Sequence, residues 1–187
     1  MVVYVFNRRG RRRGFTAAEV LVVTALLTSL NGGGNAFLGC TSKAHQTACA
    51  HNLQQIGLAI QMRTMMDEPL PRAWFYPPDP PHPARNQYHL ANVLSSDVPK
   101  QMFICPAAPQ AIQQRGICYV YNDKLGGKMP DQIPNPAATW LMMDVNLVTS
   151  EVPAAHNGGC NVLFVDGHVK WYPAAQIHAL KLFGQQQ

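Results

Sequence analysis

The sequence lacks the patterns that identify several common classes of protein. None of its five cysteines forms a CxxC pair, and none lies at the paired cysteine and histidine spacings of a zinc finger. It also has no glycine-rich phosphate-binding loop and no pair of carboxylates at helical spacing. These absences argue against a zinc-finger or phosphate-binding protein, and we expect no enzyme activity.

Acidic residues are missing from the N-terminus, where basic residues are concentrated. The formal net charge of the 187-residue chain is +5, but five of its 15 lysines and arginines precede Gly14. They are Arg8, Arg9, Arg11, Arg12 and Arg13. Without residues 1–14 the chain would have 10 basic and 10 acidic residues, so its charge makes nucleic acid an unlikely partner. The arginines are instead typical of a cytoplasmic topology signal.

An apolar run, Val20 to Leu30, follows the arginines, with one carboxylate, Glu19, just before it. A helix from Phe15 to Leu30 would be about 24 Å long, nearly enough to cross a bilayer core of about 30 Å. Glu19 would enter lipid about one turn into the helix, where an ionised carboxylate is costly and needs a positive partner. Cleavage between Gly14 and Phe15 would create that partner, the new amino group of Phe15.

The segment Gly14-Phe15-Thr16-Ala17-Ala18-Glu19 resembles the processing site of type IV prepilins and type II secretion pseudopilins. In these proteins a basic leader ends in Gly, the next residue is Phe, and Glu is fifth in the mature chain. The resemblance implies that a prepilin peptidase removes residues 1–14 and that Phe15 becomes the methylated N-terminus. It implies a structural subunit, a pseudopilin or minor pilin, for which Glu19 directs assembly.

The same resemblance implies a location and a set of partners. The protein would be a single-pass protein of the inner membrane with its head outside the cytoplasm. It would then join other pilin-like subunits, through an inner-membrane assembly platform, in a periplasmic or extracellular filament. That filament would be a type II secretion pseudopilus or a type IV pilus-like fibre.

The chain after the leader divides into three parts. Residues 15–39 form the apolar helix, and the glycine-rich stretch 31–35 predicts a break in it because glycine opposes helix formation. Residues 40–68 are the stalk, an amphipathic helix that is expected to end near Met66. Gly57 within this helix is expected to permit close packing. Its apolar face is expected to contain Ala48, Leu53, Ile56, Ile60 and Met62. Residues 69–187 form a globular head that begins with a proline-rich loop.

The head is predicted to contain a short helix and several strands. The helix covers residues 87–94, and short apolar or alternating runs predict strands at 102–105, 117–121, 139–143 and 161–165. Asp166-Gly167 predicts a hairpin with a type I′ turn, in which both central residues have positive φ. The fold class is therefore α+β and pilin-like, with a long N-terminal helix packed on a small antiparallel sheet.

The C-terminal part resembles bacterial prepilin-like proteins that carry an H-x9-DG motif. His156, Asp166 and Gly167 have the spacing of that motif. The helix segment 47–59 and the segments 103–106, 121–123, 133–136 and 156–159 follow the same family in the same order. We expect the three motif residues to be structural, with His156 near the base of the strand pair.

No cofactor is expected, although two groups of residues in the head have the ligand types of a metal site. His156, His168 and Asp166 have the ligand types of a zinc site, but Asp166 is expected to serve the turn. Asp123, Asp131 and Asp144 lie in or beside loops and offer the oxygen ligands that calcium prefers. They lack a recognisable calcium-binding series, so solvated turn aspartates are the preferred interpretation.

The cysteines leave two interpretations open. An exported head could contain a disulfide such as Cys105 to Cys118, although sequence cannot decide the connectivity. Alternatively, the cysteines are buried free thiols that pack as small apolar groups. A nucleophilic role for Cys160 with His156 is the weaker hypothesis, because no nearby cation or helix N-terminus lowers the pKa of that thiol.

A different class of protein is compatible with the same N-terminus. Arg12-Arg13-Gly14-Phe15 resembles a twin-arginine export signal, and Phe37-Leu38-Gly39-Cys40 resembles a lipoprotein cleavage box. On this hypothesis residues 1–39 are removed, Cys40 carries lipid, and the rest is a membrane-anchored binding module. Glu19 would then have no role in the mature protein.

Overall fold

The computed structural model describes residues 16–78, 86–145 and 156–179. The chain forms two compact units, residues 1–39 and residues 40–187. Gly14 and Phe15, the predicted processing site, lie outside the described residues. Within the described part of the chain, no helix combines the length and the apolar character that crossing a membrane requires.

The first helix, α1, runs from Ala17 to Thr64. The predicted break at residues 31–35 is wrong, because this stretch is helical throughout. Each glycine costs a helix only about 1 kcal/mol relative to alanine, and the helical residues on both sides are already nucleated. The helix ends two residues before the predicted Met66.

Residues 49–60 of α1 provide one side of the core of the second unit. The fully buried side chains recur at three- and four-residue intervals, and they are Cys49, Leu53, Ile56 and Ile60. The predicted face was therefore right for three residues and wrong for Ala48 and Met62, which are exposed. Gly57 allows the close packing expected of it, because a Cβ there would come within 2.8 Å of the Leu163 side chain.

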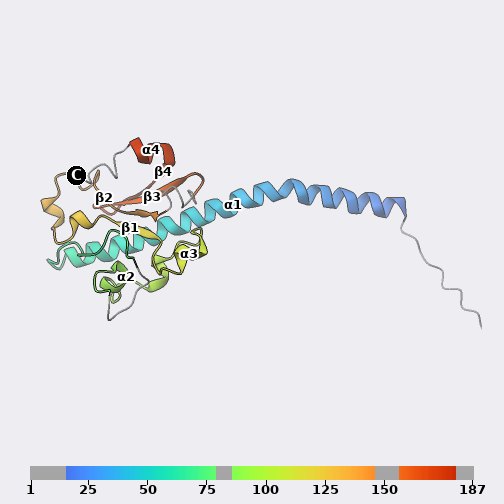
Figure 1. The fold of residues 1–187 in the computed structure, drawn as a ribbon. Helices are drawn as coiled ribbons and strands as arrows, with labels where there is room; N and C mark the ends of the chain where they lie inside the picture. Colours follow the sequence, from blue (N-terminus) through green and yellow to red (C-terminus); the bar gives the residue numbers. More distant parts are fainter. Residues whose placement is uncertain (1–15, 79–85, 146–155, 180–187) are drawn as a thin grey trace, which may run out of the picture. The chain divides into compact units, whose positions relative to one another are not determined.

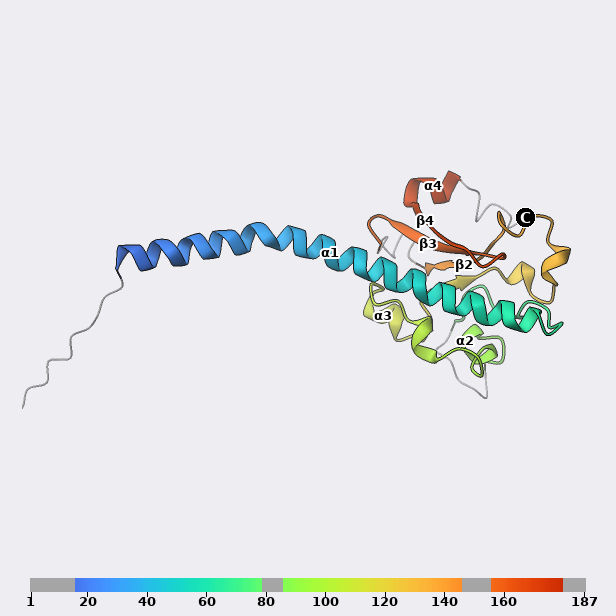
Figure 2. The same cartoon turned by 180° about the vertical axis from the view of Figure 1, so that it is seen from behind.

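The sheet has four antiparallel strands in the order β1-β2-β3-β4, which confirms the α+β class. Figures 1 and 2 show it running alongside the second half of α1. The strands are β1 (Tyr119–Tyr121), β2 (Trp140–Asp144), β3 (Gly159–Phe164) and β4 (Val169–Pro173). Every residue of β3 is buried, because Leu163 joins the core shared with α1 while Val162 and Phe164 join a second core with Ile177.

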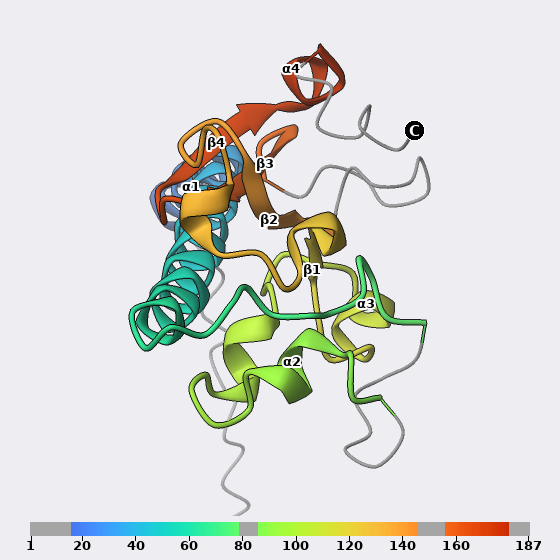
Figure 3. The same ribbon diagram turned by 90° about the vertical axis from the view of Figure 1, so that its left-hand side faces the viewer.

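Short helices lie toward the two edges of the sheet, β4 and β1 (Figure 3). Helix α4 (Ala174–Ala179) follows β4 directly, whereas α2 (Leu90–Val93) and α3 (Gln110–Gln113) lie toward β1. Three 3-10 helices complete the described elements: η1 (Lys100–Phe103), η2 (Asp123–Leu125) and η3 (Pro130–Gln132). The predicted helix 87–94 is thus shorter than expected, since it begins after an N-cap at His89.

One predicted strand, residues 102–105, is wrong. The main-chain donors of this segment bond locally instead of to a neighbouring strand: Met102 N donates to Pro99 O, and Ile104 N donates to Gln101 O. These bonds form η1, which starts immediately after Pro99.

The hairpin at Asp166-Gly167 exists, but its turn is not type I′. Gly167 N donates to Phe164 O, and Phe164 N donates to His168 O, which leaves a three-residue loop. Only Gly167 has a positive φ, of 90°, while Asp166 does not. This is the pattern of a turn with negative φ at both central residues followed by a left-handed glycine.

Candidate functional site

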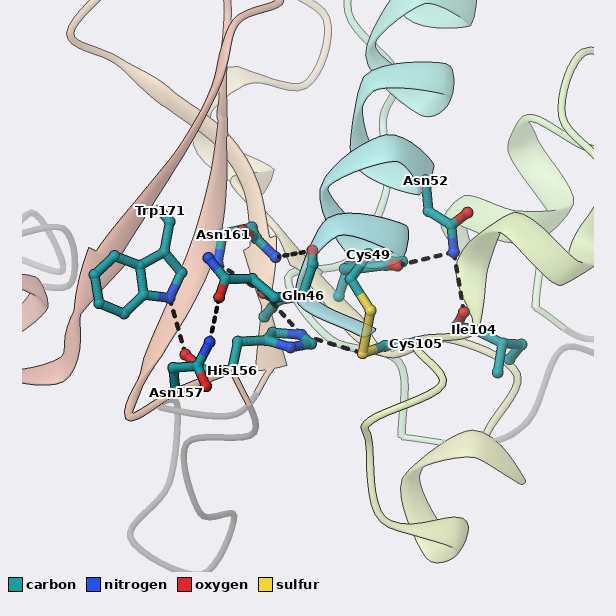
Figure 4. Close-up of polar contacts among 11 residues, drawn as sticks. Gln46, Cys49, Asn52, Ile104, Cys105, His156, Asn157, Asn161 and Trp171 are labelled. Carbon is teal, nitrogen blue, oxygen red and sulfur yellow. Dashed lines mark hydrogen bonds and ion pairs between the residues drawn. A yellow bond between two sulfur atoms is a disulfide. The ribbon is translucent and has the colours of Figure 1, made fainter. Parts of the chain in front are cut away.

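The type I′ turn of the head is found at Asn157-Gly158, immediately after His156. The φ angles of these two residues are 52° and 75°, and Gly159 N donates to His156 O at 3.0 Å. The indole nitrogen of Trp171 donates to the same oxygen at 2.9 Å. The main chain of His156 is therefore fixed at the start of β3 (Figure 4).

The turn is also attached to α1. The Asn157 side chain donates from Nδ2 to Gln46 Oε1 at 2.7 Å, and its Oδ1 accepts from Ser42 Oγ at 3.0 Å. The Asn161 side chain, two residues into β3, donates to the main-chain oxygen of Gln46 at 3.2 Å. These bonds hold the start of β3 against the helix, so the imidazole of His156 is directed into the interface between them (Figure 4).

The imidazole of His156 is completely buried and contacts two other functional side chains. Its Nε2 lies 3.3 Å from Cys105 Sγ and 3.4 Å from Asp144 Oδ2. Asp144, the last residue of β2, is 1% exposed, and its Oδ2 accepts a 2.7 Å hydrogen bond from Asn161 N. The other polar atoms, Asp144 Oδ1 and His156 Nδ1, have no hydrogen-bond partner among the described residues.

Cys105 forms a disulfide with Cys49 of α1, so the suggested Cys105–Cys118 pairing is wrong. The Cα atoms of Cys49 and Cys105 are 5.4 Å apart, within the range that a disulfide requires. The packing of the chain explains why Cys105 pairs with Cys49, because α1 lies along the segment that ends at Cys105. One turn after Cys49, Asn52 Nδ2 donates to Ile104 O at 3.1 Å.

Cys118 and Cys160 are buried free thiols, as the second interpretation of the cysteines proposed. Burial raises the pKa of Cys118 to about 11, and burial also raises the pKa of Cys160 well above its usual range. A thiol with a raised pKa supplies almost no thiolate at neutral pH. The arrangement therefore gives Cys160 no means of acting as a nucleophile.

The H-x9-DG residues do not meet in one site. The register pairs Gly159 with Pro173 and Leu163 with Val169, so His156 and the Asp166-Gly167 turn lie at opposite ends of the β3–β4 hairpin. Asp166 Oδ1 contacts His168 Nδ1 at 2.6 Å, with both side chains more than a third exposed. The zinc trio of His156, His168 and Asp166 is therefore excluded by geometry.

The calcium trio is not assembled either. Asp123 lies in η2 and Asp131 in η3, whereas Asp144 is buried beside His156. Among the described residues, one group has the ligand types and spacing for a metal ion: Cys49, Cys105, Asp144 and His156. One ligand atom from each side chain lies within 4.8 Å of the other three.

Sequence reasoning selected His156 and Cys105 but missed the roles of Cys49 and Asp144. The signal for Cys49 was its position four residues before Leu53, on the apolar face of α1. The signal for Asp144 was a carboxylate at the end of an apolar strand. Of the residues chosen near the N-terminus, Glu19 and Cys40 both lie in α1.

Comparisons of this chain with models of protein families, with curated proteins and with solved structures find no match.

Proposed function

We propose that the protein is a non-enzymatic structural subunit, a pseudopilin or minor pilin, of a pilin-like filament. The observation that carries this proposal is the order of residues at the N-terminus: arginines, then Gly14 and Phe15, then Glu19 and an apolar run. Each feature has a separate physical role. The arginines keep the leader in the cytoplasm, the junction permits processing, and the carboxylate forms an ion pair once the leader is removed.

The fold supports the proposal in two respects. Helix α1 begins at Ala17, so Glu19 belongs to its first turn, close in sequence to the amino group that processing would create. Residues 49–60 of the same helix pack on the antiparallel sheet of the head. A filament subunit needs both properties, since the first part of its helix joins other subunits while the last part holds the head.

The candidate site supports a structural rather than an enzymatic role. The four side chains of the Cys49, Cys105, Asp144 and His156 cluster are at most 1% exposed. A substrate therefore has no direct access to His156 Nε2 or to the sulfur atoms. Chemistry inside this cluster can alter the stability of the head, but turnover of an external molecule needs an open position.

In the proposed assembly, Glu19 is the residue that selects the neighbour. Within lipid its carboxylate is stabilised only by a positive partner, which the amino group of Phe15 supplies on the same chain or on an adjacent subunit. A prepilin peptidase, other pilin-like subunits and an inner-membrane platform are the implied partners. The head would lie outside the cytoplasm.

N-terminal sequencing and mass spectrometry of the membrane-extracted protein test this function. We expect a mature chain that starts at Phe15 and carries one methyl group on its amino nitrogen. A mature chain that starts at Cys40 and carries lipid would contradict the proposal and support the membrane-anchored binding module. Gly14→Ala should leave more of the longer, unprocessed form, whereas Gly10→Ala in the same leader should not.

A further inference from the structure

We propose that Cys49, Cys105, Asp144 and His156 form a zinc-binding site that is available when the two cysteines are reduced and abolished when they form the disulfide. The four residues come from α1, from the segment after η1, from β2 and from the turn before β3. All four belong to the second compact unit. The site is thus independent of the N-terminal processing on which the filament role depends.

The distances in the cluster fit tetrahedral coordination. Zinc–sulfur bonds of about 2.3 Å and zinc–nitrogen or zinc–oxygen bonds of about 2.0 to 2.2 Å place ligand atoms roughly 3.3 to 3.8 Å apart. His156 Nε2 already lies 3.3 Å from Cys105 Sγ and 3.4 Å from Asp144 Oδ2. Since all four ligand atoms are within 4.8 Å of one another, rotation of the freed thiols completes the geometry.

The electrostatics of Asp144 favour a cation at this position. The carboxylate is buried, and its one ion-pair partner among the described residues is His156. Its Oδ2 accepts the hydrogen bond from Asn161 N, but its Oδ1 has no hydrogen-bond partner among the described residues, and an unsatisfied buried carboxylate oxygen is destabilising. A divalent cation beside Asp144 and the two thiolates would balance most of this negative charge.

The ligand set selects the metal. Two thiolates and an imidazole favour zinc over calcium or magnesium, which prefer oxygen ligands. Four protein ligands complete a tetrahedral site and leave no position for a substrate or water. Together with the burial of all four side chains, this makes the site structural and not catalytic.

Metal binding and the disulfide exclude each other because both use the same sulfur atoms. Oxidation of the two bound thiolates forms the S–S bond, releases Zn²⁺ and transfers two electrons to the oxidant. When the oxidant is hydrogen peroxide, the O–O bond breaks, two protons are taken up and two water molecules form. The reduced head is therefore held together by a metal ion and the oxidised head by a covalent bond, at the same point of the fold.

The test uses the full-length protein in detergent, reduced with a phosphine, freed of metal with a chelator and kept under anaerobic conditions. Titration with Co²⁺ should give the visible absorption of tetrahedral cobalt with thiolate ligands, saturating at one ion per chain. Zn²⁺ should displace the cobalt and raise the melting temperature of the reduced protein. The same protein with the disulfide intact should bind neither ion at this site.

Variants that keep both cysteines distinguish this site from adventitious binding to thiols. Asp144→Asn and His156→Gln can be purified in the disulfide form, which checks their folding, and then reduced. Each should bind Co²⁺ at least about tenfold more weakly than the parent. Cys160→Ala, which removes a buried cysteine outside the cluster, should bind normally. A reduced parent without the cobalt absorption, or Asp144→Asn and His156→Gln with parental affinity, would overturn the proposal.

Discussion

Gln61 of α1 donates a hydrogen bond from Nε2 to the main-chain oxygen of Asp166, at 2.7 Å, across 105 residues of sequence. This bond holds the loop of the β3–β4 hairpin against the helix. The next residue, Gly167, has a φ of 90°, and a Cβ added there would overlap the Gln61 amide. Glycine is thus required at this position both by backbone conformation and by the space that Gln61 occupies.

Gly167→Ala should lower the free energy of unfolding more than Gly158→Ala. Both glycines have positive φ, which costs another residue about 1 to 2 kcal/mol. A Cβ at Gly158 meets no atom within 4 Å, whereas one at Gly167 displaces Gln61 and its hydrogen bond, a further loss of about 1 kcal/mol. Thermal unfolding followed by circular dichroism checks the difference. Equal losses for the two variants would contradict the role of Gln61. Gly167→Val should lower the free energy of unfolding more than Gly167→Ala.

Peptide mapping of the unreduced protein should recover Cys49 linked to Cys105. The bond closes a loop between residues 56 positions apart, so its loss should lower the free energy of unfolding by about 4 kcal/mol in the chain-entropy model. The comparison is between parent and Cys49→Ala, both with chelator present. Recovery of a peptide that links Cys105 to Cys118 would contradict the structure.

Stability should fall as the pH is lowered through the range in which histidine titrates, partly because of His89. Burial lowers the pKa of this imidazole, whose Nδ1 accepts a hydrogen bond from Ala91 N at the start of α2. In the unfolded state the imidazole has a pKa near 6.5, so it binds a proton at a pH at which the folded protein keeps His89 neutral. The contribution is complete above about pH 6.5 and is lost as the pH falls from there toward the folded pKa.

His89→Asn isolates this effect, because asparagine keeps a side-chain acceptor for the helix cap but does not titrate. Melting temperatures at about pH 7.5 and pH 5.5 should differ less in the variant than in the parent. The same difference in both proteins would assign the pH dependence to other groups.

Cys118 and Cys160 should resist alkylation in the folded, oxidised protein. Both thiols are buried and have raised pKa values, so neither accessibility nor thiolate formation favours reaction. Mass spectrometry after iodoacetamide treatment at pH 8 should find both unmodified, and both should be modified after unfolding in guanidinium. Rapid modification of either cysteine in the native protein would show that the head opens readily.

Glu19→Gln should leave membrane insertion intact and reduce incorporation into a filament. The substitution keeps the size of the side chain and removes the charge that pairs with the Phe15 amino group. Glu19→Asp is the matched control, since it keeps the charge on a shorter side chain and should retain more assembly. Filaments sheared from cells and quantified by immunoblot provide the measurement, with total protein as reference. Normal incorporation of Glu19→Gln would contradict the ion-pair mechanism.

Local patterns in the sequence predicted much of the head. The run Val162 to Val165 followed by Asp166-Gly167 identified the β3–β4 hairpin, since a continuous apolar run and a turn glycine are local features. The buried positions Leu53, Ile56 and Ile60 followed from helical periodicity. The type I′ turn predicted at Asp166-Gly167 was wrong, and the one at Asn157-Gly158 was not predicted. The two pairs carry similar turn signals, and only the paired strands decide which turn each makes.

The cluster could not be predicted because its members are distant in sequence. Cys49, Cys105, Asp144 and His156 meet only when α1, η1 and the sheet are packed together, and no spacing between neighbouring residues records that contact. The continuous helix at residues 31–35 illustrates a related limit. Propensity estimates the local cost of glycine, whereas the continuation of a helix also depends on the stable helix on either side.

The Cys49–Cys105 bond also determines how the chain would respond to mechanical tension. A pull applied through the N-terminal part of α1 reaches Cys49 and passes through the disulfide to Cys105, which is 56 positions later in the sequence, so the chain between the two cysteines carries no load. At about 3.3 to 3.6 Å per extended residue, reduction would add roughly 190 Å to the length of the unfolded chain between its ends. When both are unfolded by tension, an oxidised subunit would therefore extend much less than a reduced one.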